Sequence, residues 1–386
     1  MQAIERLTVI YDEDGIPDPQ RPILIGEGEK PVVVWFHDES IFFANDRRIV
    51  RWIGADEHAT PFKKGEGNTI MVADFVCPQF GWLKGKNGES ARVVFRPGVN
   101  RDGWFTCNKV VSQLEKAVKI VQETYPEYTH VFVYDNAPSH TKRPEDAISA
   151  RSMPKGEVAV FPRPYTVKGP NGTTQKVTPP RMELGRLPDG TAQSFYWPDD
   201  HERVNQRGWF KGMAQILRER GLHEVAAKKA ECLGFKCEPG RTDCCCRRAL
   251  FSQPDFESRD SNLEEAARKL GTRVIFLPKY HCELNPIEQC WGYAKRKYRQ
   301  MPPTNKESVM IKYVIDAIDS VPIQSIRKFA ARSQRFVDAY ASGRNGELAI
   351  KWATKQFRSH RTTPTHIPIE DIAPGDVHMQ NNTFNG

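Results

Sequence analysis

The chain has 386 residues, of which 39% are hydrophobic and 27% are charged. This balance is typical of a globular protein, and the length allows two domains or one core with a large insertion. No apolar stretch approaches the length of a membrane helix, and the segment MQAIERLTVIYDEDG lacks the basic region and apolar core of a signal peptide. The net charge of +8 favours a polyanionic partner such as nucleic acid.

The first part of the chain predicts an arm followed by an α/β core. Residues 1–30 are polar and rich in Asp, Gly and Pro, which is typical of a linker or extended arm. Apolar, β-branched runs then predict four strands, namely PVVVWFHDESIFF, RRIVRWIG, NTIMVADFVCPQFGWL and ARVVFRPG. An apolar stripe at helical spacing between Val110 and Val121 predicts a helix, and residues 130–134 predict the next strand. We therefore expect the first part of a core at 31–140.

The middle of the chain has a different composition, and we assign it to an insertion domain at 141–270. It contains a Pro- and Gly-rich loop, a helix around 205–220, a Cys-rich segment, and a helix whose Ser261 and Glu264 have capping-box spacing. The core resumes at 271–300 with the strand TRVIFL and a helix. Two amphipathic helices follow at 301–361, and the composition of 362–386 is typical of a flexible tail.

Three acidic motifs carry the chemistry of the sequence. In VVVWFHDES and VFVYDNAPSH, an apolar run leads to Asp38 and Asp135, and in LNPIEQCW a helix carries Glu288. A carboxylate at the end of a buried strand is costly to desolvate, and a divalent cation is the usual compensation. Each aspartate alone could equally be a loop cap. Three carboxylates that converge from separate elements predict an oxygen-only site for Mg²⁺ or Mn²⁺.

The surroundings of Glu288 favour contact with an anion as well as a metal. Asn285 can cap a helix whose first residue is Pro286, so Glu288 lies in the first turn, where the helix dipole stabilises its charge. Lys295 and Arg299 project on the same side and are candidate ligands for DNA phosphates. The alternative is that these cations belong to an ordinary solvated helix face.

Five of the nine cysteines lie between positions 232 and 246. Cys232, Cys237, Cys244 and Cys246 are candidate ligands of a structural Zn²⁺, although the spacing differs from that of a standard zinc finger. Cys245 lies in the same run, and a cluster of buried free thiols is the alternative. A zinc ion here would stabilise the insertion rather than take part in catalysis.

The three acidic motifs resemble, in order and type, those of the DDE transposases of the mariner-type superfamily, in a variant similar to transposase-derived sequences of fungal genomes. The resemblance covers roughly residues 31–300. It implies an RNase H-like mixed sheet flanked by helices, with the Cys-rich insertion between the fourth strand of that fold, here residues 130–134, and the catalytic helix. The catalytic and metal-binding triad would be Asp38, Asp135 and Glu288.

The resemblance also implies a mechanism and partners. Two Mg²⁺ or Mn²⁺ ions would support in-line cleavage of DNA and strand transfer at transposon ends, with Asp38 bridging both ions. The partners would be transposon-end and target DNA, and the assembly a homodimer in the nucleus, with no membrane. His140 would contact DNA or cap its own turn, whereas strand alternation turns Glu39 and His37 away from Asp38.

Two features depart from the family pattern. The interval between Asp135 and Glu288 is far longer than in compact members, which requires the insertion. Only about 30 residues precede the first strand, so we expect the end-recognition helix-turn-helix modules of the family to be missing here. The alternative function is a domesticated, non-catalytic DNA-binding or scaffold protein that retains the fold. A nuclease of the same fold that acts on RNA or hybrid duplexes is a third.

Overall fold

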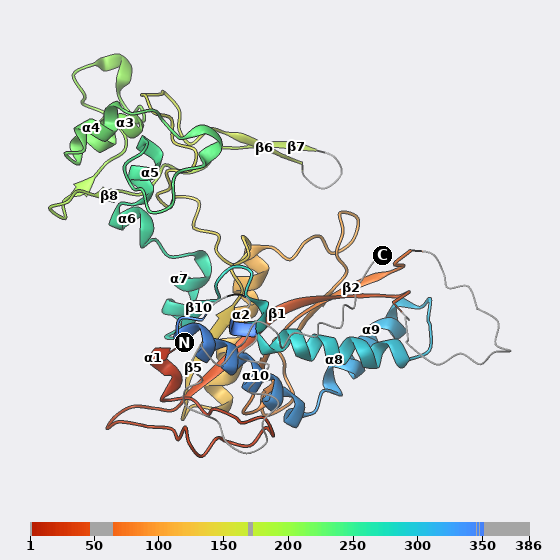
Figure 1. The fold of residues 1–386 in the computed structure, drawn as a ribbon. Helices are drawn as coiled ribbons and strands as arrows, with labels where there is room; N and C mark the ends of the chain where they lie inside the picture. The colour runs from red at the N-terminus through yellow and green to blue at the C-terminus, as the bar shows by residue number, and fades with distance from the viewer. Residues whose placement is uncertain (1, 47–64, 169–172, 345, 347, 351–386) are drawn as a thin grey trace. The chain divides into compact units, whose positions relative to one another are not determined.

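The computed structural model describes residues 2–46, 65–168, 173–344, 346 and 348–350. Two compact units make up the chain (Figure 1). Unit 1 combines Met1–His140 with Ala266–Gly386, and unit 2 is Thr141–Glu265. The insertion expected at 141–270 thus covers nearly the same stretch as unit 2, and the core of unit 1 is built from segments on both sides of it.

Unit 1 is organised around a six-stranded mixed sheet, with strands in the order β10-β5-β1-β2-β3 and with β4 also paired to β2. The strands are β1 (Val32–Phe43), β2 (Thr69–Cys77), β3 (Gly81–Trp82), β4 (Val93–Phe95), β5 (Thr129–Tyr134) and β10 (Arg273–Phe276). β2 is antiparallel to β1, β3 and β4, whereas β5 is parallel to both β1 and β10. An antiparallel meander followed by parallel strands is the RNase H-like arrangement, and the expected fold class is confirmed.

The strand predicted at RRIVRWIG lies outside the described residues. The other strands of the core form where apolar, β-branched runs predict them, because such side chains fit a sheet that is buried on both faces. Val33, Trp35, Phe132 and Val133 are all fully buried, for example.

Helices cover both faces of this sheet (Figure 1). The helices of unit 1 are α1 (Gln2–Glu5), α2 (Cys107–Thr124), α8 (Pro286–Gln300), α9 (Glu307–Asp319) and α10 (Ile323–Ala341), with a short 3₁₀ turn at Cys282–Leu284. Alternate residues of β1, including Val34 and Phe36, share a hydrophobic core with α8, α9 and α10. The opposite face meets α2, whose Gln113 hydrogen-bonds to His37 and to the carbonyl of Ala73. None of the helices in the described residues is long and apolar enough to cross a membrane.

The N-terminal segment packs against the core rather than extending from it as an arm. Its backbone joins the start of β1 through the bond from Val32 N–H to Leu7 O (2.7 Å). Tyr11 is buried beneath the guanidinium of Arg327 on α10. Arg21 pairs with Asp338 of the same helix at 2.9 Å. The segment is polar because its side chains make ion pairs with α10, which the composition alone could not distinguish from solvation.

Unit 2 has its own hydrophobic core. Its helices are α3 (Gly212–Glu219), α4 (His223–Ala227), α5 (Cys246–Phe251), α6 (Pro254–Glu257) and the start of α7 (Asn262–Lys269), with 3₁₀ turns at Val204–Gln206 and Leu233–Phe235. Its hairpins pair β6 (Tyr165–Lys168) with β7 (Thr174–Val177) and β8 (Gly185–Arg186) with β9 (Ala192–Gln193). Phe195, Phe210, Met213 and Leu217 are among the buried residues of this core.

Two local predictions in unit 2 had different outcomes. The capping box of α7 is confirmed, because Ser261 N–H donates to Glu264 Oε2 (2.8 Å) and Glu264 N–H donates to Ser261 Oγ (3.2 Å). The helix predicted around 205–220 begins only at Gly212. The preceding backbone is used in bridges instead, since Phe210 pairs with both Val158 and Tyr196.

Candidate active site

The three predicted carboxylates lie on adjacent elements of unit 1. Asp38 is inside β1, which continues to Phe43, and Asp135 directly follows β5. In the parallel register Phe36 faces Val133, so each aspartate lies two residues beyond this pair on neighbouring strands. Neighbouring strands are about 4.8 Å apart, which makes the two aspartates close neighbours at one edge of the core. Glu288 comes from the first turn of α8, the helix that packs on the same face of β1.

These carboxylates repel one another. Burial raises the pKa of Asp38 well above its usual value, and the negative charges of Glu288, Glu39 and Asp135 raise it further. Partial burial also raises the pKa of Glu288, with Asp135 adding to the effect and Lys295 opposing it. An acidic group whose ionisation is opposed by burial and by like charges lacks a sufficient counter-ion within the protein. A bound divalent cation would supply one.

The donor set fits a hard cation, because all three side chains offer carboxylate oxygens. In the described residues, however, the groups of donor atoms that all lie within 4.8 Å of one another are two others: Cys232, Cys237, Cys244 and Cys245, and His37, Glu39 and His140. Asp38, Asp135 and Glu288 are thus neighbours, but their carboxylate oxygens do not all lie within 4.8 Å of one another.

Asp38 is held in place by the start of α8, which carries the third motif. Trp291 of α8 donates its indole N–H to Asp38 Oδ2 at 3.0 Å. Asn285 precedes α8, but the predicted side-chain cap is wrong, because its side chain makes no hydrogen bond to the first turn. Its side-chain amide donates instead to the carbonyl of His37 at 3.0 Å. The LNPIEQCW motif therefore attaches the start of α8 to β1 at two points beside the carboxylate. This explains why an asparagine and a tryptophan flank Glu288.

His140 joins two acidic side chains. Its Nδ1 lies 2.5 Å from Asp135 Oδ1, and its Nε2 lies 3.1 Å from Glu39 Oε1. Burial of the ring opposes its charge, but the hydrogen bonds to Asp135 and Glu39 outweigh burial and raise the pKa of His140 to about 10. Burial acts to raise the pKa of Glu39, but the bond to His140 lowers it overall. His140 is thus a buried cation that orients Asp135.

Glu39 is the site residue that sequence reasoning did not select. Strand alternation does turn it away from Asp38, as expected, but the turn after β5 brings His140 to that second face. The only signal in the sequence was a histidine five residues after Asp135. Its partner depends on the pairing of β1 with β5, which local patterns do not specify.

His37 is a neutral, structural member of this second face. Burial is the main cause that lowers its pKa to about 4. Its Nε2 lies 2.9 Å from Gln113 Oε1, and the amide of Gln113 donates to the carbonyls of Ala73 and Ala91. Because the oxygen of Gln113 can only accept, Nε2 of His37 carries the proton. The donor atoms of His37, Glu39 and His140 are close, but the protonated ring of His140 already satisfies Glu39.

The two basic residues predicted on α8 have different surroundings. The ammonium of Lys295 lies 5.8 Å from the ring centre of Phe42. Burial lowers its pKa, while the charges of Glu288 and Asp38 act in the opposite direction. Arg299 makes a two-pronged ion pair with Asp46, with both bonds at 3.0 Å. Lys295 therefore lies beside the carboxylates, and contact of either residue with DNA stays a prediction.

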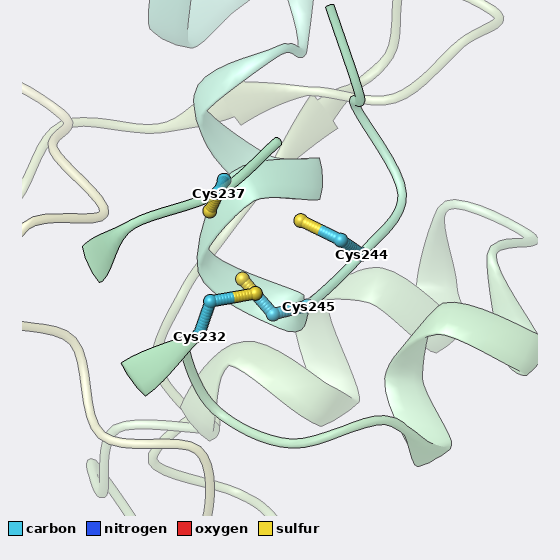
Figure 2. Close-up of side chains that lie close together, drawn as sticks. All are labelled: Cys232, Cys237, Cys244 and Cys245. Carbon is cyan, nitrogen blue, oxygen red and sulfur yellow. The ribbon is translucent and has the colours of Figure 1, made fainter. Parts of the chain in front are cut away.

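The cysteine cluster of unit 2 is assembled with one change from the predicted set (Figure 2). The cluster contains the predicted Cys232, Cys237 and Cys244, and its fourth sulfur atom comes from Cys245 rather than from Cys246. Cys246 is excluded because its thiol faces the carbonyls of Val225 (3.3 Å) and Lys228 (3.4 Å) instead. Adjacent residues at a helix start project about 100° apart, so only one of the two can face the cluster.

Comparison with known proteins finds matches among solved structures. No protein-family model and no curated protein sequence matches the chain. Among solved structures, a Mos1 mariner paired-end complex with Mn is 11% identical over 81% of this chain and 56% of that chain, with a TM-score of 0.39. A pre-cleavage Mos1 transpososome is 10% identical with the same coverage and a TM-score of 0.41. The Mos1 transposase catalytic domain with Raltegravir and Mg is 9% identical, with a TM-score of 0.34, over 81% of this chain and 85% of that one.

The fold is RNase H-like. This assignment rests on the strand order and register of unit 1. The chain spans 56% of the length of the transposase chains in the first two complexes. The similarity to these structures therefore does not show that this chain has the activity, substrate or partners of a whole transposase.

Proposed function

We propose that this chain is the catalytic part of a metal-dependent DNA transposase of the mariner type, which cleaves DNA and joins strands at transposon ends. One observation carries the proposal. Two aspartates lie in register beyond the paired part of neighbouring parallel strands, beside a glutamate at the start of the packed helix, and the charge of Asp38 is not balanced within the protein.

In the proposed site, Asp38, Asp135 and Glu288 would hold Mg²⁺ or Mn²⁺. When bound, two such ions lower the pKa of the attacking water or 3′-hydroxyl and stabilise the leaving oxygen. The chain itself orients the ligands. Trp291 fixes Asp38, and His140 fixes Asp135 through Oδ1, which also accepts the N–H of Ala137. Lys295 lies where its positive charge would stabilise a phosphate next to the carboxylates.

The proposed partners follow from the same reasoning. The net charge of +8 and the basic end of α8 support a DNA partner, with transposon ends and target as substrates. Because two transposon ends would be processed together, we propose a homodimer, and because we propose a DNA substrate we also propose that the protein acts in the nucleus. The solved relatives are DNA complexes of a transposase, which supports this choice of partner.

Nicking of supercoiled plasmid tests the proposal. The wild type would be incubated with Mg²⁺, Mn²⁺ or EDTA beside Asp135→Asn, with Asp316→Asn as the matched control, because Asp316 is exposed on α9. We expect nicking with either metal, none with EDTA, loss of nicking in Asp135→Asn and full activity in the control. Competition with RNA and hybrid duplexes would define the substrate class.

The opposite result is equally clear. If the wild type binds DNA but nicks it with neither metal, the proposed catalytic function is contradicted. The alternative, a non-catalytic DNA-binding or scaffold protein with a transposase fold, would then account for the retained binding.

A further inference from the structure

We propose that Cys232, Cys237, Cys244 and Cys245 of unit 2 bind one structural zinc ion. Their four sulfur atoms all lie within 4.8 Å of one another (Figure 2). In a tetrahedral site with Zn–S bonds of about 2.3 Å, the sulfurs are about 3.8 Å apart. The arrangement therefore needs only a small contraction to surround one ion.

The local backbone holds the first two cysteines together by a tight turn. Cys232 precedes the 3₁₀ turn Leu233–Phe235, and its carbonyl accepts the N–H of Phe235 at 2.9 Å. Both Gly234 and Phe235 have φ near +59°. A left-handed conformation at a non-glycine residue is strained, and such strain persists only where surrounding interactions impose it. A metal ion bound by Cys232 before the turn and Cys237 after it would impose this conformation on Phe235.

The other two cysteines lie at the start of α5. Cys245 is the N-cap residue, and its sulfur accepts the backbone N–H of Arg248 at 3.4 Å. The side chain of Arg248 lies near Cys237. The N-cap contact fixes the sulfur of Cys245 at the start of α5, on the side of the cluster formed by Cys244 and Cys245.

The segment between the cysteines has no hydrophobic core of its own. None of residues 231–243 is buried, and the side chain of Leu233 is 94% exposed. A stretch of this length without buried apolar groups lacks the usual source of folding energy. Structural zinc supplies that energy directly in small folds. A zinc ion would therefore explain how this exposed segment has a defined path back to α5.

The chemistry of the donors selects the metal and the role. Sulfur donors favour Zn²⁺ over Mg²⁺, and four protein ligands leave no open position for a substrate. Disulfide bonds are the alternative use of these thiols. All four cysteines are free in the structure, and mutual proximity of four sulfurs suits a central ion better than two separate pairs. The site is separate from the three carboxylates, and its role does not depend on the proposed function.

Zinc analysis of the full-length chain tests the assignment. The protein would be purified without added metal or chelator, and its zinc content measured by mass spectrometry for wild type, Cys237→Ser, Cys245→Ser, Cys246→Ala and Cys282→Ser. We expect about one zinc ion per chain in the wild type. Cys246→Ala and Cys282→Ser should keep it, because Cys246 faces carbonyls and Cys282 is an exposed cysteine of unit 1. Cys237→Ser and Cys245→Ser should lose most of it.

A Co²⁺ titration of the zinc-stripped wild type keeps the test independent of variant folding. We expect thiolate-to-cobalt charge-transfer and tetrahedral d–d absorption that saturate at one equivalent and disappear on addition of Zn²⁺. Absence of both zinc and this spectrum, or a mass that shows paired cysteines in freshly purified protein, would overturn the proposal. Loss of zinc in Cys246→Ala but not in Cys245→Ser would overturn the assigned ligand set.

Discussion

At the scale of single residues, Asp38 is the carboxylate of the site whose charge the protein does not neutralise. Asp38 combines burial with three acidic neighbours, and its only hydrogen-bond donor from a side chain is the neutral indole of Trp291, among the contacts of the described residues. Asp74, which faces Asp38 across β1 and β2, is fully buried but pairs with Arg92. Asp74 thus has a cationic partner within the protein, whereas Asp38 has none among the contacts of the described residues.

Asp38→Asn should make the metal-free protein more stable at neutral pH. The folded-state pKa of Asp38 is raised, so its ionisation above that pKa favours the unfolded chain, and a neutral amide removes the penalty. Its Oδ1 can still accept the N–H of Trp291. Thermal unfolding in EDTA would measure the shift, with Asp46→Asn as control because that change removes the partner of Arg299. A lower melting temperature for Asp38→Asn would contradict this view of the site.

Glu39→Gln should reduce metal-dependent cleavage while leaving the chain folded. Glutamine keeps an oxygen for Nε2 of His140 but removes the charge that holds the ring protonated between two acids. Loss of a residue that orients a metal ligand typically costs about 10- to 100-fold. Nicking rates would be compared with those of Glu115→Gln, an exposed position on α2. Equal rates would show that His140 orients Asp135 without help from Glu39.

At the scale of elements, α8 links the carboxylates to a basic surface. Its first turn carries Glu288, its buried side carries Trp291 and Tyr298, and its basic side carries Lys295 and Arg299. The helix dipole stabilises a negative charge in the first turn, where Glu288 lies, and a positive charge in the last turn, where Arg299 lies. One amphipathic helix can therefore pack on the sheet, present a metal ligand and present a cation within a short distance.

Lys295→Gln should weaken DNA binding through loss of one phosphate contact. The slope of log affinity against log salt should become shallower by about 1, uniformly across DNA sequences. Fluorescence anisotropy at several salt concentrations would measure it. Lys312→Gln, at an exposed position on α9, is the matched control. An unchanged slope in Lys295→Gln would remove this residue from the DNA interface.

Unit 2 depends on a buried ion pair that should give it a distinct acid sensitivity. Arg220 binds both oxygens of Asp255 at 2.7 and 2.8 Å, and their side chains are 1% and 10% exposed. Burial acts to raise the pKa of Asp255, but the hydrogen bond from Arg220 outweighs it and lowers the pKa. The stabilisation is thus present above the unfolded pKa of about 3.9 and is lost as pH falls through the lower folded value.

Asp255→Asn should remove this part of the acid dependence and destabilise unit 2 at neutral pH by about 3–5 kcal/mol, because it leaves the charge of Arg220 buried. Urea unfolding of the full chain between acidic and neutral pH would measure both effects. Asp200→Asn, at an exposed position in the same unit, should change neither. A neutral-pH loss of stability as small as that of the control would show that water screens the pair.

At the scale of the whole molecule, the two units have separate cores and distinct site chemistry. Unit 1 is interrupted in sequence by unit 2, yet its sheet combines β1 and β5 with β10, which follows the insertion. The carboxylates Asp38, Asp135 and Glu288 lie in unit 1, and the clustered sulfur donors lie in unit 2. The proposed catalytic metal site and the proposed structural zinc site are thus in different units.

Most strands and helices of the core could be predicted, because their signals are local. The runs that form β1 and β5 and the capping box of α7 are examples. The remaining features depend on contacts between distant residues. The role of Glu39 requires the register of β1 with β5, and the choice of Cys245 over Cys246 requires the start of α5. The late start of α3 reflects bridges made by Phe210, which no local pattern encodes.

The central claim, that Asp38, Asp135 and Glu288 together bind a catalytic divalent cation, is tested most directly by Mn²⁺ binding in the presence of duplex DNA. Electron paramagnetic resonance would count bound Mn²⁺ for the wild type, Asp38→Asn, Asp135→Asn, Glu288→Gln and the control Asp316→Asn. We expect saturable binding in the wild type and control, and a marked loss in each of the three site variants. Equal Mn²⁺ binding by all five proteins, or none by the wild type, would contradict the account.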